Sequence, residues 1–259
     1  MNGYLLPKNF QLQEDVRLSL MNHLGSNPQL DLYLAAYVDG SKFNTVSKME
    51  KAIQILIYIH AAFGTIALLA GLIAMIAKKG KTVHKKSGLL FFYSMILSGL
   101  TAMMVSIAPN HESPFLFSIG IFSSYFILTG KRALNFKTDN ENLIIDKIIS
   151  WAMLFTGLVM ILYNPIFNSK INIILTVFGL VGLIFSIRDL VLYKDIKKLK
   201  KGWLKLHLGK MIGGYISATT AFVVVNNFFP SFYGWFIPGI FGGIYITYWM
   251  MKLNKKTYS

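Results

Sequence analysis

Residues 57–106 read IYIHAAFGTIALLAGLIAMIAKKGKTVHKKSGLLFFYSMILSGLTAMMVS. The stretch contains two apolar runs of about 20 residues, and each is long enough to cross the hydrocarbon of a bilayer as a helix. A helix satisfies its own backbone hydrogen bonds, which any segment inside lipid must do. The short lysine-rich turn between the runs returns the chain to the side from which it came. This stretch therefore predicts an antiparallel pair of transmembrane helices.

Each run carries a histidine at the head of a stripe of mostly small residues. The spacings of four and three residues place each stripe on one helix face. In the first run the stripe consists of His60, Gly64, Ala67, Gly71 and Ala74. In the second it consists of His84, Gly88, Phe91, Met95, Ser98 and Ala102. Small residues let helix backbones approach closely in lipid, so these faces are predicted to be buried.

Composition assigns the whole chain to the membrane. Of its 259 residues 54% are hydrophobic and only 14% are charged, and the apolar residues come in long runs. The net charge of +15 comes from lysines between these runs, where the positive-inside rule accounts for them, so nucleic acid is not an expected partner. The expected partner is the lipid bilayer. A membrane-protein partner and the oligomeric state are left open.

Seven apolar runs of spanning length follow Met49. They cover approximately residues 52–77, 88–108, 114–134, 147–167, 171–193, 207–229 and 233–252. Lysines crowd the turns after the first and fifth runs and are absent from the turns after the second and sixth. This alternation predicts an all-α, polytopic bundle of seven transmembrane helices, with the amino terminus outside and the carboxyl terminus cytoplasmic.

Residues 1–48 form a separate, non-membrane tail in this interpretation, and residues 49–259 form the transmembrane domain. The tail lacks the apolar core of a secretory signal and its charges balance. Met49 directly precedes the first run, which raises the alternative that residues 1–48 are an over-extended reading frame.

Several ionisable side chains fall inside the runs, where each needs a physical reason. His60 is interpreted either as a neutral histidine bonded to a neighbouring helix or as a ligand or proton carrier. The topology places four other side chains at one level, near the cytoplasmic ends of four helices: His84, Arg132, Asp189 and His207. Met211 follows His207 on the same helix face. These six residues are the candidate cofactor-binding residues.

Two interpretations of the four residues at one level stay open. They could converge on one inner-leaflet site that holds a metal ion, clamps an anionic headgroup or binds a quinone. Alternatively, they are separate interfacial side chains, with Asp189 as counter-ion to Arg188 or His207. Small residues beneath histidines would also give room to a haem. Two haems would need four axial ligands in two layers, and the sequence does not supply them. The spacing therefore allows one haem and not two.

The motifs leave open whether the protein is an enzyme. Cysteine is absent, which excludes disulfides, thiolate metal sites and cysteine nucleophiles. No serine–histidine–acid order and no phosphate-binding loop occurs. The favoured function is a non-catalytic small-molecule or lipid-binding protein, or a subunit of a complex. The alternative is a haem-, metal- or quinone-dependent redox protein that uses His84 and His207.

Four sequence words suggest a family. HAAFGTIALLAG (60–71), KKGKTVHKKSG (78–88), SYFILTGKRAL (124–134) and WLKLHLGKMIGGYISATTAFVVVN (203–226) occur in this order. With them the chain resembles the bacterial membrane proteins catalogued as domain of unknown function 2306, over nearly all of residues 49–256. The resemblance implies a multi-pass protein of the bacterial inner membrane and brings no established activity.

Overall fold

The computed structural model describes the backbone of residues 28–138, 142–230 and 232–255 and the side chains from Lys48 onward, except those of residues 168 and 255. Within these ranges the fold is all-helical and has no strand, as predicted. The elements are α2 (Pro28–Ile76), α3 (Thr82–Ser106), α4 (Pro114–Arg132), the short 3-10 helix η1 (Asn135–Lys137), α5 (Ile144–Asn168), α6 (Ile173–Leu192), α7 (Ile196–Val225) and α8 (Tyr233–Lys255).

The chain divides into two compact units, Met1–Ile55 and Leu56–Ser259. The second unit contains helices α3 to α8 and the part of α2 from Leu56 onward. Residues 1–27 of the predicted tail lie outside the described residues, whereas residues 28–48 belong to helix α2.

Six helical segments are long and apolar enough to cross a membrane. They are Lys48–Ile76, Thr82–Ser106, Pro114–Lys137, Ile144–Phe167, Ile173–Leu192 and Ile196–Val225. Helix α8 coincides with the seventh predicted run but is not among these candidates. The fold is therefore that of a multi-pass helical membrane protein.

The second lysine-rich segment differs from the sequence-based prediction. The sequence predicts a turn there, whereas in the structure α7 begins at Ile196 and runs through this segment. Asp195 caps this helix: its side chain accepts a 3.0 Å hydrogen bond from the backbone N–H of Lys198. Such a cap satisfies one of the backbone donors left open at a helix start, and this explains why α7 begins before the apolar run does.

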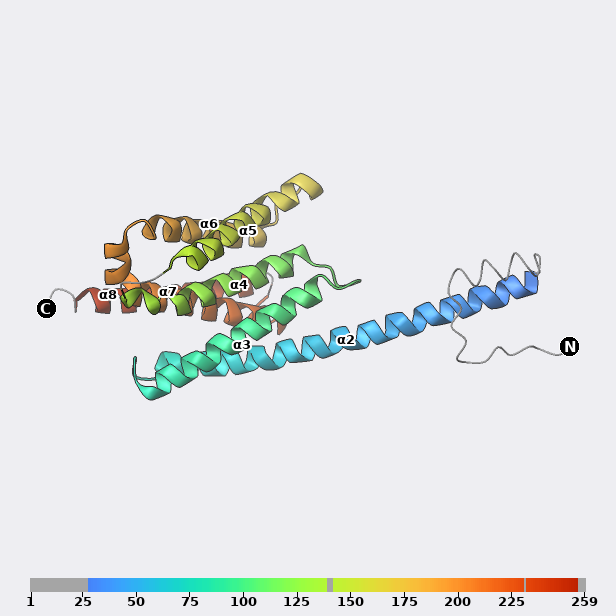
Figure 1. Cartoon of the computed structure of the whole chain (residues 1–259), viewed down its shortest axis with the longest axis horizontal. Coiled ribbons are helices and arrows are strands. Elements are labelled where there is room, and N and C mark those ends of the chain that lie inside the picture. Colours follow the sequence, from blue (N-terminus) through green and yellow to red (C-terminus); the bar gives the residue numbers. More distant parts are fainter. Residues whose placement is uncertain (1–27, 139–141, 231, 256–259) are drawn as a thin grey trace. The chain divides into compact units, whose positions relative to one another are not determined.

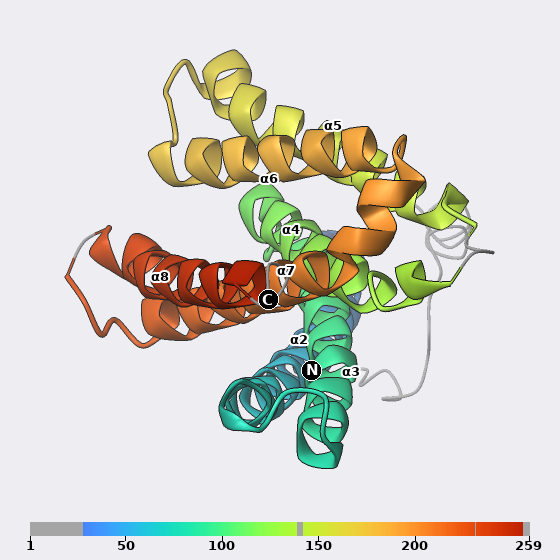
Figure 2. The same cartoon turned by 90° about the vertical axis from the view of Figure 1, so that its left-hand side faces the viewer.

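Helices α4 and α7 pack against each other in the middle of this unit (Figures 1 and 2). Helices α5 and α6 form a pair that packs on α4 (Figure 2). Helix α8 lies against α7, and α3 packs on another side of α4. Buried side chains of α2, α3 and α4 share one apolar cluster with residues of α7. The two central helices therefore contact almost every other element of the unit.

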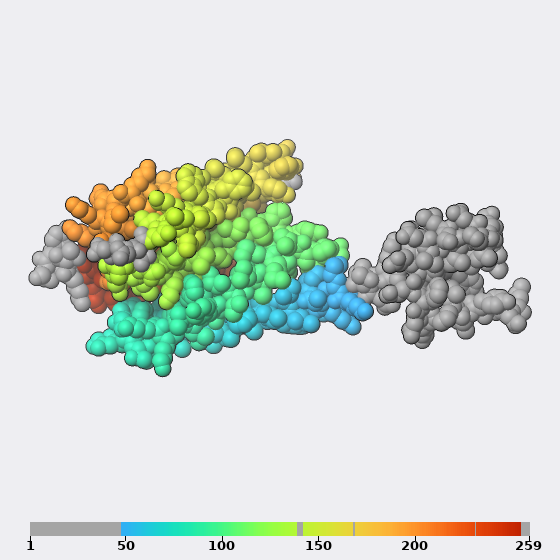
Figure 3. Space-filling model, in the orientation of Figure 1, coloured from blue at the N-terminus to red at the C-terminus, as the bar shows by residue number. Residues whose placement is uncertain are grey.

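The distribution of side chains is the reverse of that in a soluble protein. Large apolar residues face outward on several helices, for example Leu69, Phe155 and Ile184, which are 60%, 69% and 53% exposed. In the space-filling view α5 and α6 (yellow-green to orange) form one side of this unit (Figure 3). Charged residues such as Asp189 and Lys210 are instead buried. Lipid around the bundle explains this pattern, because polar groups inside a membrane must find partners within the protein.

The predicted small-residue faces are buried where they were expected. Ala67 and Ala74 on α2 and Phe91 and Met95 on α3 all lie in the interior. The closest approach occurs at Gly71, where an added Cβ would lie 2.5 Å from a ring carbon of Tyr215 on α7. The stripe therefore serves contacts with α7 as well as the α2–α3 pair.

We expect Gly71→Ala to lower the free energy of unfolding by about 1–3 kcal/mol, because Tyr215 must be displaced. Gly64→Ala is the matched control on the same helix face: the nearest atom to its added Cβ is Ser98 Oγ at 3.5 Å, an ordinary contact. Thermal unfolding of the two variants in detergent measures the difference. Equal stabilities would show that Tyr215 moves aside at no cost.

Candidate functional site

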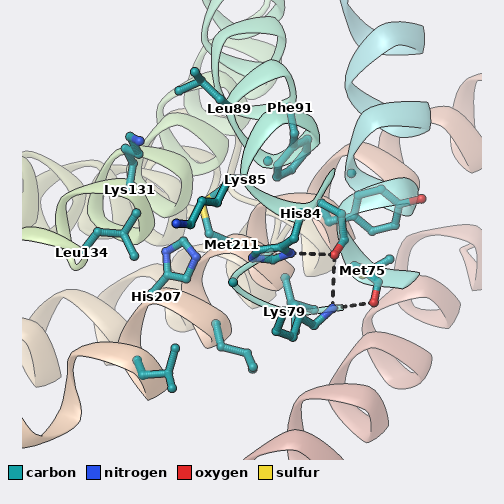
Figure 4. A pocket seen from close by; sticks show the side chains of 18 of the residues that line it. Met75, Lys79, His84, Lys85, Leu89, Phe91, Lys131, Leu134, His207 and Met211 are labelled. Carbon is teal, nitrogen blue, oxygen red and sulfur yellow. Dashed lines mark hydrogen bonds between the residues drawn. The ribbon is translucent and has the colours of Figure 1, made fainter. Parts of the chain in front are cut away.

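A cavity of about 450 Å³ lies where α2, α3, α4, α7 and α8 meet. This is within the range of sites that enclose a small-molecule ligand. Its lining is largely apolar and includes Phe91, Leu134, Trp203, Ile212 and Tyr245. Gly88 leaves space open, since an added Cβ there would meet nothing within 4 Å. Figure 4 shows the cavity from close by.

His84 reaches this cavity from the first turn of α3. Its Nδ1 lies 2.9 Å from the carbonyl oxygen of Ala74, near the end of α2 (Figure 4). The last four carbonyls of a helix have no partner within it, so this contact satisfies one of them. Lys79 donates to the carbonyls of Ala74 and Met75, and Tyr245 donates to Met75 at 3.0 Å. The end of α2 is thus closed by side chains from three segments.

The turn between α2 and α3 places Lys79 beside these carbonyls. Gly80 has φ +78°, a left-handed conformation that glycine adopts without strain. Burial lowers the pKa of Lys79, because desolvation disfavours its charged form.

His207 reaches the same cavity from α7. Its Nδ1 lies 2.7 Å from the carbonyl oxygen of Gly130, in the last turn of α4. Gly130 allows this contact, because a Cβ there would lie 3.0 Å from both Lys210 Cβ and Met211 Sδ. Met211 also lines the cavity, one helical turn after His207. The structure therefore brings three of the six candidate residues, His84, His207 and Met211, to one site.

The two histidines present the same atom to the cavity. A carbonyl oxygen can only accept a hydrogen bond, so Nδ1 of each ring carries the proton and donates it. The neutral ring then has an electron pair on Nε2. Among the described residues, neither Nε2 has a hydrogen-bond partner.

The charged groups around the cavity all have one sign. Lys79, Lys85, Lys131 and Lys137 line it, and no described lining residue is a carboxylate. Lys137 also lies over the ring of Trp203, 4.0 Å from its centroid. The site therefore combines a cationic edge with an apolar and aromatic interior.

Asp189 does not belong to this cavity, which corrects the prediction that it joins His84 and His207. Its Oδ2 accepts from Lys210 Nζ and from Tyr125 Oη, each at 2.5 Å, and Lys210 also donates to Tyr125. All three residues are at most 3% exposed. The counter-ion of Asp189 is thus Lys210, neither Arg188 nor His207.

Arg132 is also separate from the cavity. Its Nε and Nη2 each donate to Asp146 over 2.7 Å, one to each carboxylate oxygen. Asp146 is fully buried in the first turn of α5. This bidentate ion pair joins the end of α4 to the start of α5. Equal depth in the membrane thus predicted a single cluster that the helix packing divides into three sites.

His60 lies in none of these sites. Its Nδ1 is 2.9 Å from the carbonyl oxygen of Ser98 and 3.0 Å from Ser98 Oγ, on the neighbouring helix α3. This contact fits the first interpretation, in which His60 is bonded to a neighbouring helix.

Sequence reasoning missed Lys210, Tyr125 and Asp146. The signal for Lys210 was available, because it is a lysine inside an apolar run and needs a partner in the same way as Asp189. Tyr125 carried no such signal, since tyrosine is common in transmembrane helices. Asp146 was hidden by its position at the edge of a run, where a solvated carboxylate is ordinary.

Comparisons with known proteins do not identify the site. No family model, no curated protein and no solved structure matches the chain.

Proposed function

We propose that the protein is a multi-pass membrane protein whose cavity binds an amphipathic anion, a molecule with an apolar body and a negatively charged group. The observation that carries this proposal is the lining of the cavity: its described residues include four lysines and no carboxylate, together with apolar and aromatic side chains. Lysines of this kind attract a charged group, and the apolar interior removes the body of the ligand from water or lipid headgroups. In this proposal the protein binds its ligand without chemistry.

A localisation and a family belong to the same proposal. The four sequence words and the six apolar helices support a protein of the bacterial inner membrane related to domain of unknown function 2306. The lysine alternation supports seven spans with the amino terminus outside and the lysine-rich turns in the cytoplasm. In that orientation the cavity would lie at the inner leaflet.

We expect single cysteines introduced at Asn110 and Lys198 to react with membrane-impermeant maleimide from opposite sides. The chain contains no native cysteine, so no background has to be removed. In intact cells Asn110→Cys should be labelled, and Lys198→Cys should be labelled only after the membrane is opened. Labelling of Lys198→Cys from outside would reverse the proposed orientation.

We expect the protein to bind oleoyl-lysophosphatidate in preference to oleoyl-lysophosphatidylcholine, which has the same chain but a zwitterionic headgroup. A hydrogen bond to a charged group is worth about 1.5–3 kcal/mol, so Lys131→Gln should weaken binding of the anionic lipid by about tenfold or more. Native mass spectrometry and the fluorescence of Trp203, which lines the cavity, measure the two affinities.

Lys198→Gln is the matched control for this measurement, because Lys198 is exposed and lies outside the cavity. It should leave both affinities unchanged. Equal binding of the two lipids, or equal effects of the two substitutions, would remove the anion-binding function.

A further inference from the structure

We infer that the cavity is a haem site, in which Nε2 of His84 and Nε2 of His207 coordinate the iron and the lysines at its edge pair with the porphyrin carboxylates. The inference rests on the proposed function, since the porphyrin is then the amphipathic anion. It names the ligand class. It also gives the two histidines a role, which anion binding alone does not.

The chemistry of the two imidazoles carries the inference. Both line the same cavity (Figure 4), His84 from α3 and His207 from α7. In each ring Nδ1 is held by a backbone carbonyl, at 2.9 Å for His84 and 2.7 Å for His207. Metal-ligating histidines are oriented in this way, with the other nitrogen left to the metal. A phosphate, carboxylate or quinone oxygen could accept from Nε2 only after this atom gains a proton, whereas a metal ion binds its lone pair directly.

The charges of the cavity favour a metal inside an anionic macrocycle over a bare ion. The charged side chains among the described lining residues are four lysines, so an isolated metal cation would meet like charges there. No group of three histidine, cysteine, aspartate or glutamate side chains placed to hold a metal ion is found among the described residues. A porphyrin supplies the remaining four nitrogen ligands itself, and its two carboxylates complement the lysines.

The shape of the lining also suits a flat ligand. Ala74 and Gly88 contribute little bulk to the wall formed by α2 and α3, and an added Cβ at Gly88 would meet nothing within 4 Å. Phe91, Trp203 and Tyr215 contribute aromatic side chains to the lining, and aromatic rings pack well against a macrocycle. Met211 lies one turn from His207 on α7 and adds a polarizable side chain at the same wall.

The test is a titration of the purified full-length protein in detergent with iron protoporphyrin IX. We expect one equivalent to give the absorption and electron paramagnetic resonance spectra of low-spin, six-coordinate iron with two imidazole ligands. His84→Ala and His207→Ala should each convert the bound iron to a high-spin, five-coordinate form and weaken binding by about tenfold or more. Added imidazole should restore the low-spin spectrum, because it enters the position that the side chain has left.

His60→Ala is the matched control. His60 is also held through Nδ1 by a backbone carbonyl, but it lies outside the cavity. Its substitution should leave the spectrum of the bound iron unchanged. Metal-free protoporphyrin IX checks the fold of the other two variants: it keeps the carboxylates and lacks the iron, so His84→Ala and His207→Ala should bind it as the unsubstituted protein does.

The outcomes separate this inference from the proposed function. High-spin iron in the unsubstituted protein, or low-spin iron that survives both histidine substitutions, would overturn the haem site. If metal-free protoporphyrin or oleoyl-lysophosphatidate still binds in a manner that depends on Lys131, the anion-binding function stands without it. If none of the three ligands binds, both proposals fail together.

Discussion

Lys210→Met is expected to lower the free energy of unfolding by about 3–5 kcal/mol, among the largest effects of any single substitution in this protein. The ammonium of Lys210 lies 2.5 Å from Asp189 Oδ2 inside the bundle, and both side chains are almost fully buried. Removing the cation leaves the carboxylate buried and charged, with Tyr125 Oη as its remaining donor. An uncompensated charge in a medium of low polarity is far more costly than the loss of one contact.

The aromatic rings around Lys210 add to this effect. Its ammonium lies 4.1 Å from the ring centroid of Tyr125, 5.1 Å from that of Phe185 and 5.3 Å from that of Phe126. Aromatic faces attract cations, and more strongly where water is excluded. Methionine fills a similar volume without a charge, so the expected loss measures electrostatics and not a cavity.

The double variant Asp189→Leu/Lys210→Met distinguishes a penalty for unpaired charge from a general loss of packing. We expect it to be more stable than either single variant, because no charge is then left unpaired. The residual cost should be about 1–3 kcal/mol, from the hydroxyl of Tyr125 that loses its partners. Denaturant unfolding in a defined detergent gives the three values.

The ion pair of Asp195 with Lys198 is the matched control. Its side chains are 41% and 79% exposed and its atoms are 3.2 Å apart, so Lys198→Met, which leaves the cap formed by Asp195 in place, should have little effect on stability. Additive effects of Asp189→Leu and Lys210→Met would contradict the coupling. Asp189→Asn and His207→Gln, by contrast, should be additive, because the two residues lie in different sites.

Gly157→Ala and Gly179→Ala are expected to destabilise the protein by about 1–3 kcal/mol each, the second large effect. These two glycines face each other where α5 crosses α6. A Cβ on either one would lie 2.9 Å from the carbonyl oxygen of the other. A backbone oxygen cannot rotate away as a side chain can, so the two helices must separate and lose dispersion contacts along the crossing.

Gly243→Ala is the control for these two variants, because an added Cβ there has nothing within 4 Å. It should be neutral or slightly stabilising, since alanine forms helices better than glycine. Thermal unfolding in the same detergent compares the three. If all three variants had the same stability, the α5–α6 crossing would have to be looser than its backbone contacts indicate.

The sequence by itself determined that this protein is a membrane protein and that its secondary structure is helical. Runs of about 20 apolar residues can satisfy their backbone inside lipid only as helices, so the all-helical fold followed from length and hydropathy alone. The buried faces of α2 and α3 followed from the spacing of Gly71, Ala74, Phe91 and Met95, because small and apolar residues at helical period mark a packed face. Both predictions use only residues that are close to one another in the sequence.

Only the tertiary structure decided which polar groups meet. His84, Arg132, Asp189 and His207 have equal depth along the membrane normal, but depth is one coordinate, and the rotation of each helix about its axis supplies another. Helix packing turns Asp189 toward Lys210, Arg132 toward Asp146, and only His84 and His207 into a common cavity. That rotation depends on contacts such as the one between Gly157 and Gly179, and these involve residues far apart in the sequence.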